Sequence, residues 1–158
     1  MNSATGLSVR KAMTVETTQA RAFEVFVNQM SSWWPLESHV IGEKPAQAAL
    51  VEPHAGGRWF ERDKNGAECD WGRVVSLDQP NRIVLTWQLS TAFQYDPALV
   101  TEVEVRFVAE TPHRTRVELE HRGLEAYGEE AAEMQAMFES PDAWELGLLR
   151  YVALANAA

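Results

Sequence analysis

The chain has 158 residues, of which 46% are hydrophobic and 23% are charged, an ordinary composition for a globular protein. This length predicts a single domain over residues 1–158, with a core large enough to need no metal or disulfide. The 23 acidic and 14 basic residues give a formal net charge of −9, which disfavours nucleic acid as a partner because phosphate backbones repel an acidic surface.

The first part of the chain predicts a strand and then a helix. Residues 7–15 alternate between apolar and polar side chains, as a half-buried strand does. The spacing of the apolar residues that follow predicts a helix from about Thr18 to Met30, with Thr17 or Thr18 as its N-cap. The side chains that share its apolar face are Phe23, Phe26, Val27 and Met30.

Strand patterns dominate the next hundred residues. The extended segments are expected at residues 48–52, 58–63, 69–77, 82–90, 99–109 and 117–121. Asn65-Gly66 is a strong signal for a hairpin turn. Because the connections are short, these strands should pair as an antiparallel meander with one apolar face and one charged face.

The C-terminal part predicts helices. Glu129 to Phe138 has weak helical character, and Ser140-Pro141-Asp142 is typical of an N-cap, a first-turn proline and an acidic first turn. We therefore expect a helix from Pro141 to about Asn156, whose apolar face is formed by Trp144, Leu148 and Tyr151. Among the expected elements only this helix is long and apolar enough to cover the sheet. The result is an α+β fold in which a curved antiparallel sheet of about six to seven strands wraps around a long C-terminal helix, with an apolar cavity between them.

Several segments together resemble the SRPBCC superfamily, which includes START-domain lipid carriers, aromatase/cyclases and birch-pollen-allergen-like proteins. The segments are Pro53–Trp59, Trp71–Val74, Asn81–Trp87 and Thr101–Val105. The most similar branch is the one named after the homologue of the activator of the heat-shock-protein-90 ATPase. The resemblance extends from about Leu7 to Tyr151 and implies a helix-grip fold with a hydrophobic cavity. It implies no invariant catalytic residue, and Ala143 stands before Trp144 where the branch usually has glycine.

Seven residues are candidate ligand contacts, because they lie on the expected inward strand positions or on the C-terminal helix. They are Trp71, Arg73, Trp87, Phe107, Leu119, His121 and Trp144. The aromatic residues either line an open cavity or fill it. His121 either orients a ligand or acts as a general base, or it is a buried histidine held by hydrogen bonds. Arg73 either captures a ligand carboxylate or forms an ion pair with Glu61 or Glu68.

Five further residues lie in expected loops, where they either form the rim of the cavity entrance or pack beneath the loops. They are Trp33, Trp34, His39, Phe93 and Tyr95. An exposed Trp33-Trp34 patch would also allow a homodimer.

Metal and cofactor motifs are missing from the sequence. The histidines have no metal-binding spacing, and there is neither a nucleophile elbow nor a phosphate-binding glycine loop. No metal and no cofactor is therefore predicted.

Targeting signals are also missing. Met1 to Leu7 lack the apolar stretch of a signal peptide, and no run approaches the ~18 apolar residues of a membrane span. The single cysteine, Cys69, excludes an intrachain disulfide and is interpreted as a small buried residue. We expect a cytoplasmic protein.

Three functions remain open from the sequence. The first is binding of a small hydrophobic or aromatic molecule, lipid-like or polyketide-like, in the cavity. The second is a cyclase or hydrolase-like enzyme that uses His121 or Arg73; if the chain is an enzyme, the resemblance implies a polyketide cyclase-like reaction. The third is a co-chaperone-type interaction module, which rests on the branch name alone.

Overall fold

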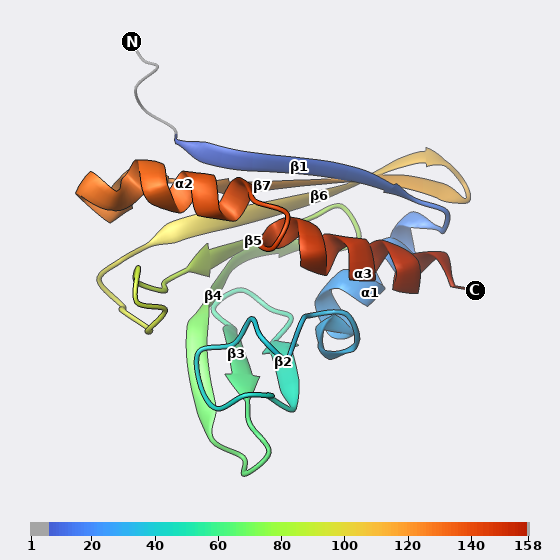
Figure 1. Ribbon diagram of the computed structural model, residues 1–158. Coiled ribbons are helices and arrows are strands. Elements are labelled where there is room, and N and C mark those ends of the chain that lie inside the picture. Colours follow the sequence, from blue (N-terminus) through green and yellow to red (C-terminus); the bar gives the residue numbers. More distant parts are fainter. Residues whose placement is uncertain (1–6, 158) are drawn as a thin grey trace.

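A seven-stranded antiparallel sheet curls around the helices in the computed structural model, which describes residues 7–157 (Figure 1). The strands are β1 (Ser8–Val15), β2 (Ala48–Val51), β3 (Arg58–Arg62), β4 (Glu68–Asp78), β5 (Arg82–Trp87), β6 (Thr101–Thr111) and β7 (Arg114–Arg122). The helices are α1 (Gln19–Asn28), α2 (Ala131–Glu139) and α3 (Trp144–Asn156), with short 3-10 segments η1 (Met30–Ser32) and η2 (Leu124–Glu130). The strand order β1-β7-β6-β5-β4-β3-β2 confirms the predicted meander and the helix-grip fold. Residues 1–6, to which the signal-peptide prediction mainly refers, lie outside the described residues.

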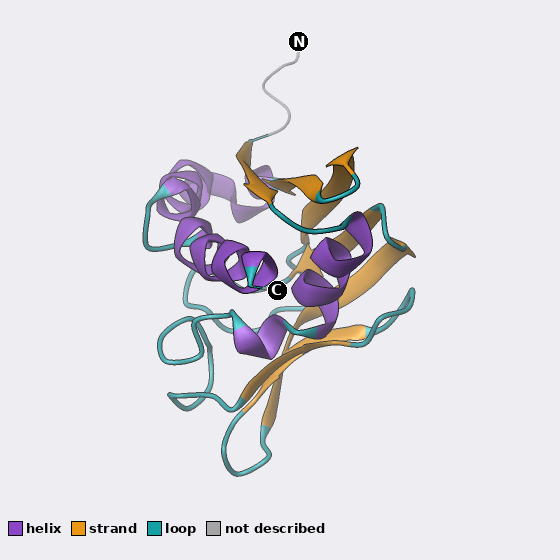
Figure 2. Cartoon of the chain, turned by 90° about the vertical axis from the view of Figure 1, so that its right-hand side faces the viewer, coloured by secondary structure: helices purple, strands orange, loops and turns teal. Residues whose placement is uncertain are grey.

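The two faces of the sheet differ as the alternation predicts. On β6 and β7 the inward side chains Val105, Phe107 and Leu119 are buried, whereas Arg106 and Arg116 point outward. This division matches a sheet that is covered on one side. Figure 2 shows the helices gathered on that one side. No helix within residues 7–157 has the length and apolar character needed to cross a membrane.

One carboxylate on the outer face is nevertheless buried. The Glu104 side chain is only 4% exposed, because three arginine side chains surround it. Burial works to raise the pKa of Glu104, but hydrogen bonds from Arg82, Arg106 and Arg122 outweigh burial and lower the pKa to about 2. This cluster joins β5, β6 and β7 across their outer face.

Two bulges in β4 change which of its side chains face inward. Trp59 pairs with Gly72 and Phe60 with Asp70, so Trp71 is an extra residue, and a second register shift follows between Val74 and Ser76. The prediction that Trp71 and Arg73 both face inward is therefore wrong: Trp71 is buried, whereas Arg73 is partly exposed.

Helix α1 begins as predicted and shares the covering of the sheet. The Thr18 hydroxyl accepts a hydrogen bond from the Arg21 amide at 3.1 Å and caps the helix. Phe23 and Phe26 pack edge-on against Phe107, with ring centroids 5.2 and 5.8 Å apart. The expectation that the C-terminal helix alone covers the sheet is therefore wrong, because α1 buries the part beneath β6.

The C-terminal helix begins later than predicted. The Ser140 hydroxyl donates to the Met137 carbonyl at 2.7 Å at the end of α2, and no side chain caps α3, whose N-cap residue is Ala143. Pro141 and Asp142 form a turn, and the Ala143 amide donates to the Ser140 carbonyl at 3.2 Å. Helix α3 therefore starts at Trp144, where the turn ends.

Candidate functional site

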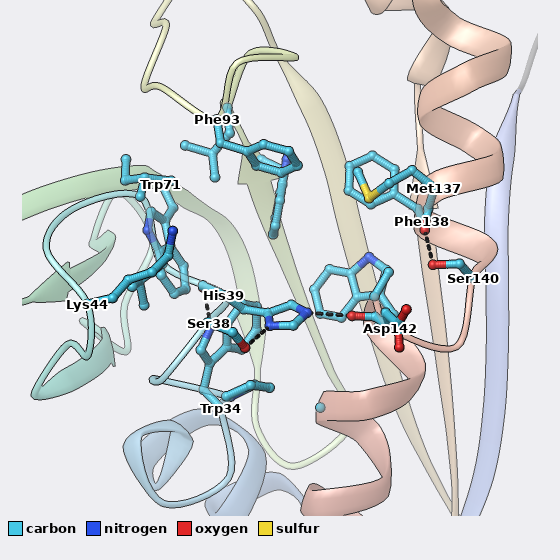
Figure 3. Close-up of a pocket in the computed structure, with 18 of the residues that line it drawn as sticks. Trp34, Ser38, His39, Lys44, Trp71, Phe93, Met137, Phe138, Ser140 and Asp142 are labelled. Carbon is cyan, nitrogen blue, oxygen red and sulfur yellow. Dashed lines mark hydrogen bonds between the residues drawn. The ribbon is translucent and has the colours of Figure 1, made fainter.

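A cavity of about 600 Å³ lies between the sheet, the α2–α3 turn and the loop formed by residues 33–47 (Figure 3). Its walls are mainly aromatic. The lining includes Trp34, Trp71, Trp87, Phe93, Phe138 and Trp144. Both the sheet and the C-terminal helices contribute to this lining, as expected for a helix-grip cavity.

The tryptophans of the cavity pack against one another as a continuous wall. Trp34 lies at 4.8 Å from Trp71 and at 5.7 Å from Trp144, measured between ring centroids. Trp87 lies at 5.6 Å from both Trp144 and Phe138. Tilted and edge-on contacts at these distances are favourable because each ring has a negative face and a positive edge. These contacts hold the rings of the wall against one another.

Loop 33–47 buries both of its tryptophans. The Trp33 indole donates to the Val25 carbonyl at 3.1 Å, and the Trp34 indole donates to the His39 carbonyl at 2.8 Å. Trp33 is 1% exposed and Trp34 is 7% exposed. Of the two alternatives for these tryptophans, packing beneath the loop is therefore confirmed, and the exposed patch that would have allowed a homodimer is not formed.

Glu61 is a buried carboxylate that fixes this loop and one wall of the cavity. Its Oε1 accepts hydrogen bonds from the Trp71 indole and the Ile41 amide, both at 2.7 Å, and its Oε2 accepts from the Gly42 amide at 2.9 Å. Glu61 is 1% exposed, so these three donors replace water around its charge. Glu61 thereby positions Trp71. The sequence predicted Glu61 only as a partner of Arg73, which instead approaches Asp70 at 3.4 Å.

His121 lies beneath the cavity wall and is fully hydrogen-bonded. The Thr101 hydroxyl donates to the Trp87 carbonyl at 2.8 Å, so it accepts from His121 Nε2, also at 2.8 Å. The Trp144 indole donates to His121 Nδ1 at 3.2 Å. The imidazole is therefore neutral with its proton on Nε2, and burial lowers its pKa to about 3. Because the Nδ1 lone pair accepts from the Trp144 indole, His121 orients that residue, and neither of its ring nitrogens is free in this arrangement.

The other predicted contacts separate into two groups. Trp71, Trp87 and Trp144 line the cavity, and their role in binding a ligand stays a prediction. The remaining four, Arg73, Phe107, Leu119 and His121, lie outside the lining. Phe107 and Leu119 are at most 1% exposed and belong to the packed core.

The residues expected at the rim also differ in their positions. Phe93 lines the cavity, is 41% exposed, and has a positive φ of 56°, which is an uncommon backbone conformation for an aromatic residue. Tyr95 packs against the core, and its backbone forms an isolated antiparallel β-bridge with Leu89. Phe93 therefore presents its ring at the entrance, whereas Tyr95 does not.

A polar edge completes the cavity on the side of the α2–α3 turn. His39 Nε2 donates to the Asp142 carbonyl oxygen, which can only accept, so His39 Nδ1 accepts the proton of the Ser38 hydroxyl at 2.6 Å (Figure 3). Among the described residues that line the cavity, Lys44 is the one lysine or arginine and Asp142 is the one carboxylic acid. The sequence suggested His39 as a rim residue but missed Ser38 and Lys44, since polar loop residues carry no periodic signal.

Metal-binding geometry is missing from the described part of the chain. Within residues 7–157 no group of three histidine, cysteine, aspartate or glutamate residues is placed to hold an ion. Cys69 is partly buried, and burial raises the pKa of its thiol.

Residues 16–141 match the sequence profile of the family described as Activator of Hsp90 ATPase homolog 1-like protein. A comparison with curated proteins gave no match. Among solved structures, the chain is similar to Txn09, an anthrahydroquino-γ-pyrone synthase complexed with SUM, with 34% identity over 93% of this chain and 96% of that one and a TM-score of 0.65. It is also similar to CalC, a self-sacrificing resistance protein from Micromonospora echinospora, with 28% identity over 94% of each chain and a TM-score of 0.70. Protein NE0264 from Nitrosomonas europaea, at 12% identity over 94% of this chain and 93% of that one with a TM-score of 0.63, shares the fold.

Proposed function

The chain belongs to the Activator of Hsp90 ATPase homolog 1-like family, and on this premise we propose that it binds a flat, aromatic, polyketide-like molecule in the tryptophan-lined cavity. The observation that carries the proposal is the wall formed by Trp34, Trp71, Trp87 and Trp144 around a space of about 600 Å³. Ligand pockets typically occupy about 300–1,000 Å³ and combine apolar walls with a few polar groups.

The chemistry of the cavity suits an extended ring system. Indole faces stack on flat conjugated ligands, and aromatic pairs are more favourable than their buried area alone would predict. The family and the similarity to a synthase of an anthrahydroquinone-containing product support a ligand-binding or cyclase role in broad terms. The narrower choice of a polyketide-like ligand is our proposal.

The proposal can be tested by titrating the protein with anthraquinone-2-carboxamide, a neutral flat aromatic probe, and following tryptophan fluorescence. We expect saturable quenching in the wild type. Phe93→Ala should weaken binding by about five- to tenfold, the effect of losing one aromatic contact of about 1 kcal/mol.

Leu149→Ala is the matched control for this variant. Leu149 is also a large exposed apolar residue, at 63% exposure, but it lies outside the cavity lining. Its replacement should leave the Kd unchanged. Absence of saturable quenching in the wild type, or equal effects of the two variants, would contradict the proposal.

A second candidate function is a cyclase-like reaction, which the Ser38–His39 pair favours. The Ser38 hydroxyl donates a hydrogen bond to His39 Nδ1, and both residues line the cavity. A base held by a third group beside a hydroxyl is a recurring arrangement for moving protons to and from a substrate. The pair could therefore exchange a proton with the enol of a bound ketone.

Product analysis distinguishes the cyclase from a carrier. The wild type should shift the product distribution of a reactive linear poly-β-ketone away from that of its spontaneous cyclisation, as measured by liquid chromatography and mass spectrometry. Ser38→Ala and His39→Gln should restore the spontaneous distribution while probe binding persists. An unchanged distribution with the wild type would leave binding as the function.

The chaperone interaction that the family name suggests stays a prediction. It can be checked by measuring whether the full chain changes the ATPase rate of a purified heat-shock-protein-90 chaperone. An unchanged rate would count against this interaction.

A further inference from the structure

We propose that the cavity recognises an acidic group on its aromatic ligand, and that Lys44 binds this group. The inference rests on the proposed binding function and specifies the ligand class as a flat aromatic molecule that carries a carboxylate or an ionised enol.

Lys44 is held at the cavity although its side chain is exposed. The Gly42 amide, two residues before it, donates to buried Glu61, and the Ala46 amide, two residues after it, donates to the Leu36 carbonyl at 3.0 Å. The backbone on both sides is therefore fixed. Lys44 belongs to the cavity lining together with Trp71, and Figure 3 shows it on the Trp71 side.

The Lys44 ammonium has no carboxylate partner within the described residues. No aspartate or glutamate oxygen of residues 7–157 lies within 4.0 Å of it, the limit for an ion pair. Asp142, the carboxylic acid of the lining, lies on the opposite side of the cavity next to Ser140 in Figure 3. A cation without a carboxylate partner at an apolar cavity is available for an anionic ligand group.

The surroundings of Lys44 also strengthen such an interaction. Indole rings displace water from one side of the cavity, and an ion pair gains strength where water is partly excluded. An ammonium group binds a carboxylate or enolate as a compact charge with rotatable donors, so it tolerates different placements of the acidic group on the ring system. The contact would fix which end of the ligand remains at the entrance.

Two probes of equal shape and different charge provide the test: anthraquinone-2-carboxylate and anthraquinone-2-carboxamide, titrated at neutral pH and low salt. The wild type should bind the carboxylate about five- to tenfold more tightly, the factor expected for one charge-assisted contact at a partly exposed site. Lys44→Gln should remove this preference, and Lys44→Glu should reverse it. The preference in the wild type should also decrease as salt is added.

Lys64→Gln is the matched control, because Lys64 is an exposed lysine in the β3–β4 hairpin, outside the lining. It should keep the wild-type preference. If the wild type binds the carboxamide as tightly as the carboxylate, or if Lys44→Gln keeps the preference, the inference is overturned while the proposed function stands. If neither probe binds, the proposed function and this inference fail together.

Discussion

The neutral state of His121 predicts a specific loss of stability in mild acid. The buried imidazole has a pKa of about 3 in the folded protein, against 6.5 without burial. Below pH 6.5 the unfolded chain therefore binds a proton that the folded chain excludes, so the free energy of unfolding decreases as the pH falls from 6.5 toward 3.

The size of this effect follows from the gap between the pH and the unfolded pKa. At about pH 5 this gap is about 1.5, and each pH unit corresponds to about 1.4 kcal/mol, so His121 alone should cost about 2 kcal/mol relative to pH 7. The folded-state pKa has little influence on this number, because it lies well below the pH used.

Urea unfolding at the two pH values, for the wild type and for His121→Gln, measures the effect. The glutamine side chain has a donor and an acceptor but no proton to gain, so the variant should lose about 2 kcal/mol less than the wild type between the two pH values. The comparison concerns the change with pH, so a lower stability of the variant at pH 7 does not disturb it. Equal changes in both proteins, or titration of the His121 ring signals near pH 6.5 by nuclear magnetic resonance, would refute the reasoning.

Four further predictions concern stability. Glu61→Gln should lower the free energy of unfolding, measured in urea, by about 2–3 kcal/mol, because one buried donor loses its acceptor and the other two hydrogen bonds lose a charged acceptor. Glu118→Gln on the exposed face is the control and should change this free energy by at most about 0.5 kcal/mol. Equal effects of the two variants would contradict the prediction. Glu104 stabilises the fold fully above its unfolded pKa of 4.5, and this contribution is lost as the pH falls toward about 2. Glu104→Gln should therefore flatten the acid unfolding curve measured by circular dichroism. Parallel curves for the wild type and the variant would count against this prediction. Gly147→Ala should raise stability by about 0.5–1 kcal/mol through helix propensity, since its new methyl group would meet its nearest neighbour at 3.5 Å. Gly72→Ala should prevent folding, since its methyl carbon would lie 1.9 Å from a backbone oxygen of β5, and a folded variant would refute this.

The sequence predicted the structure best for strands that have one buried face and one face exposed to solvent. The alternation along β6 and β7 identified both strands and the inward positions of Phe107, Leu119 and His121, because burial and period two coincide there. On β4 the same rule placed Arg73 on the inside. It failed because two bulges add residues to the strand, and a bulge leaves no mark in the hydrophobic pattern.

Side-chain hydrogen bonds decided the other differences. Ser140 is a residue type typical of an N-cap, but it stands at the C-terminal end of α2, and the turn formed by Pro141 and Asp142 separates it from α3. The cavity wall was partly predictable, since Trp71, Trp87 and Trp144 follow strand or helix spacing. The roles of Glu61 and Lys44 at the cavity depend on how the irregular loop 33–47 folds back on the sheet. Such long-range contacts have no local sequence signal.

Intermolecular nuclear Overhauser effects between a bound flat aromatic probe and the tryptophan rings test the central claim most directly. Four of the six tryptophans, Trp34, Trp71, Trp87 and Trp144, line the cavity, whereas Trp33 and Trp59 lie behind the wall. With anthraquinone-2-carboxamide bound, we expect effects to the four lining rings and none to the other two. Effects to Trp33 or Trp59 without the lining rings, or to no tryptophan at all, would contradict a ligand site in this cavity.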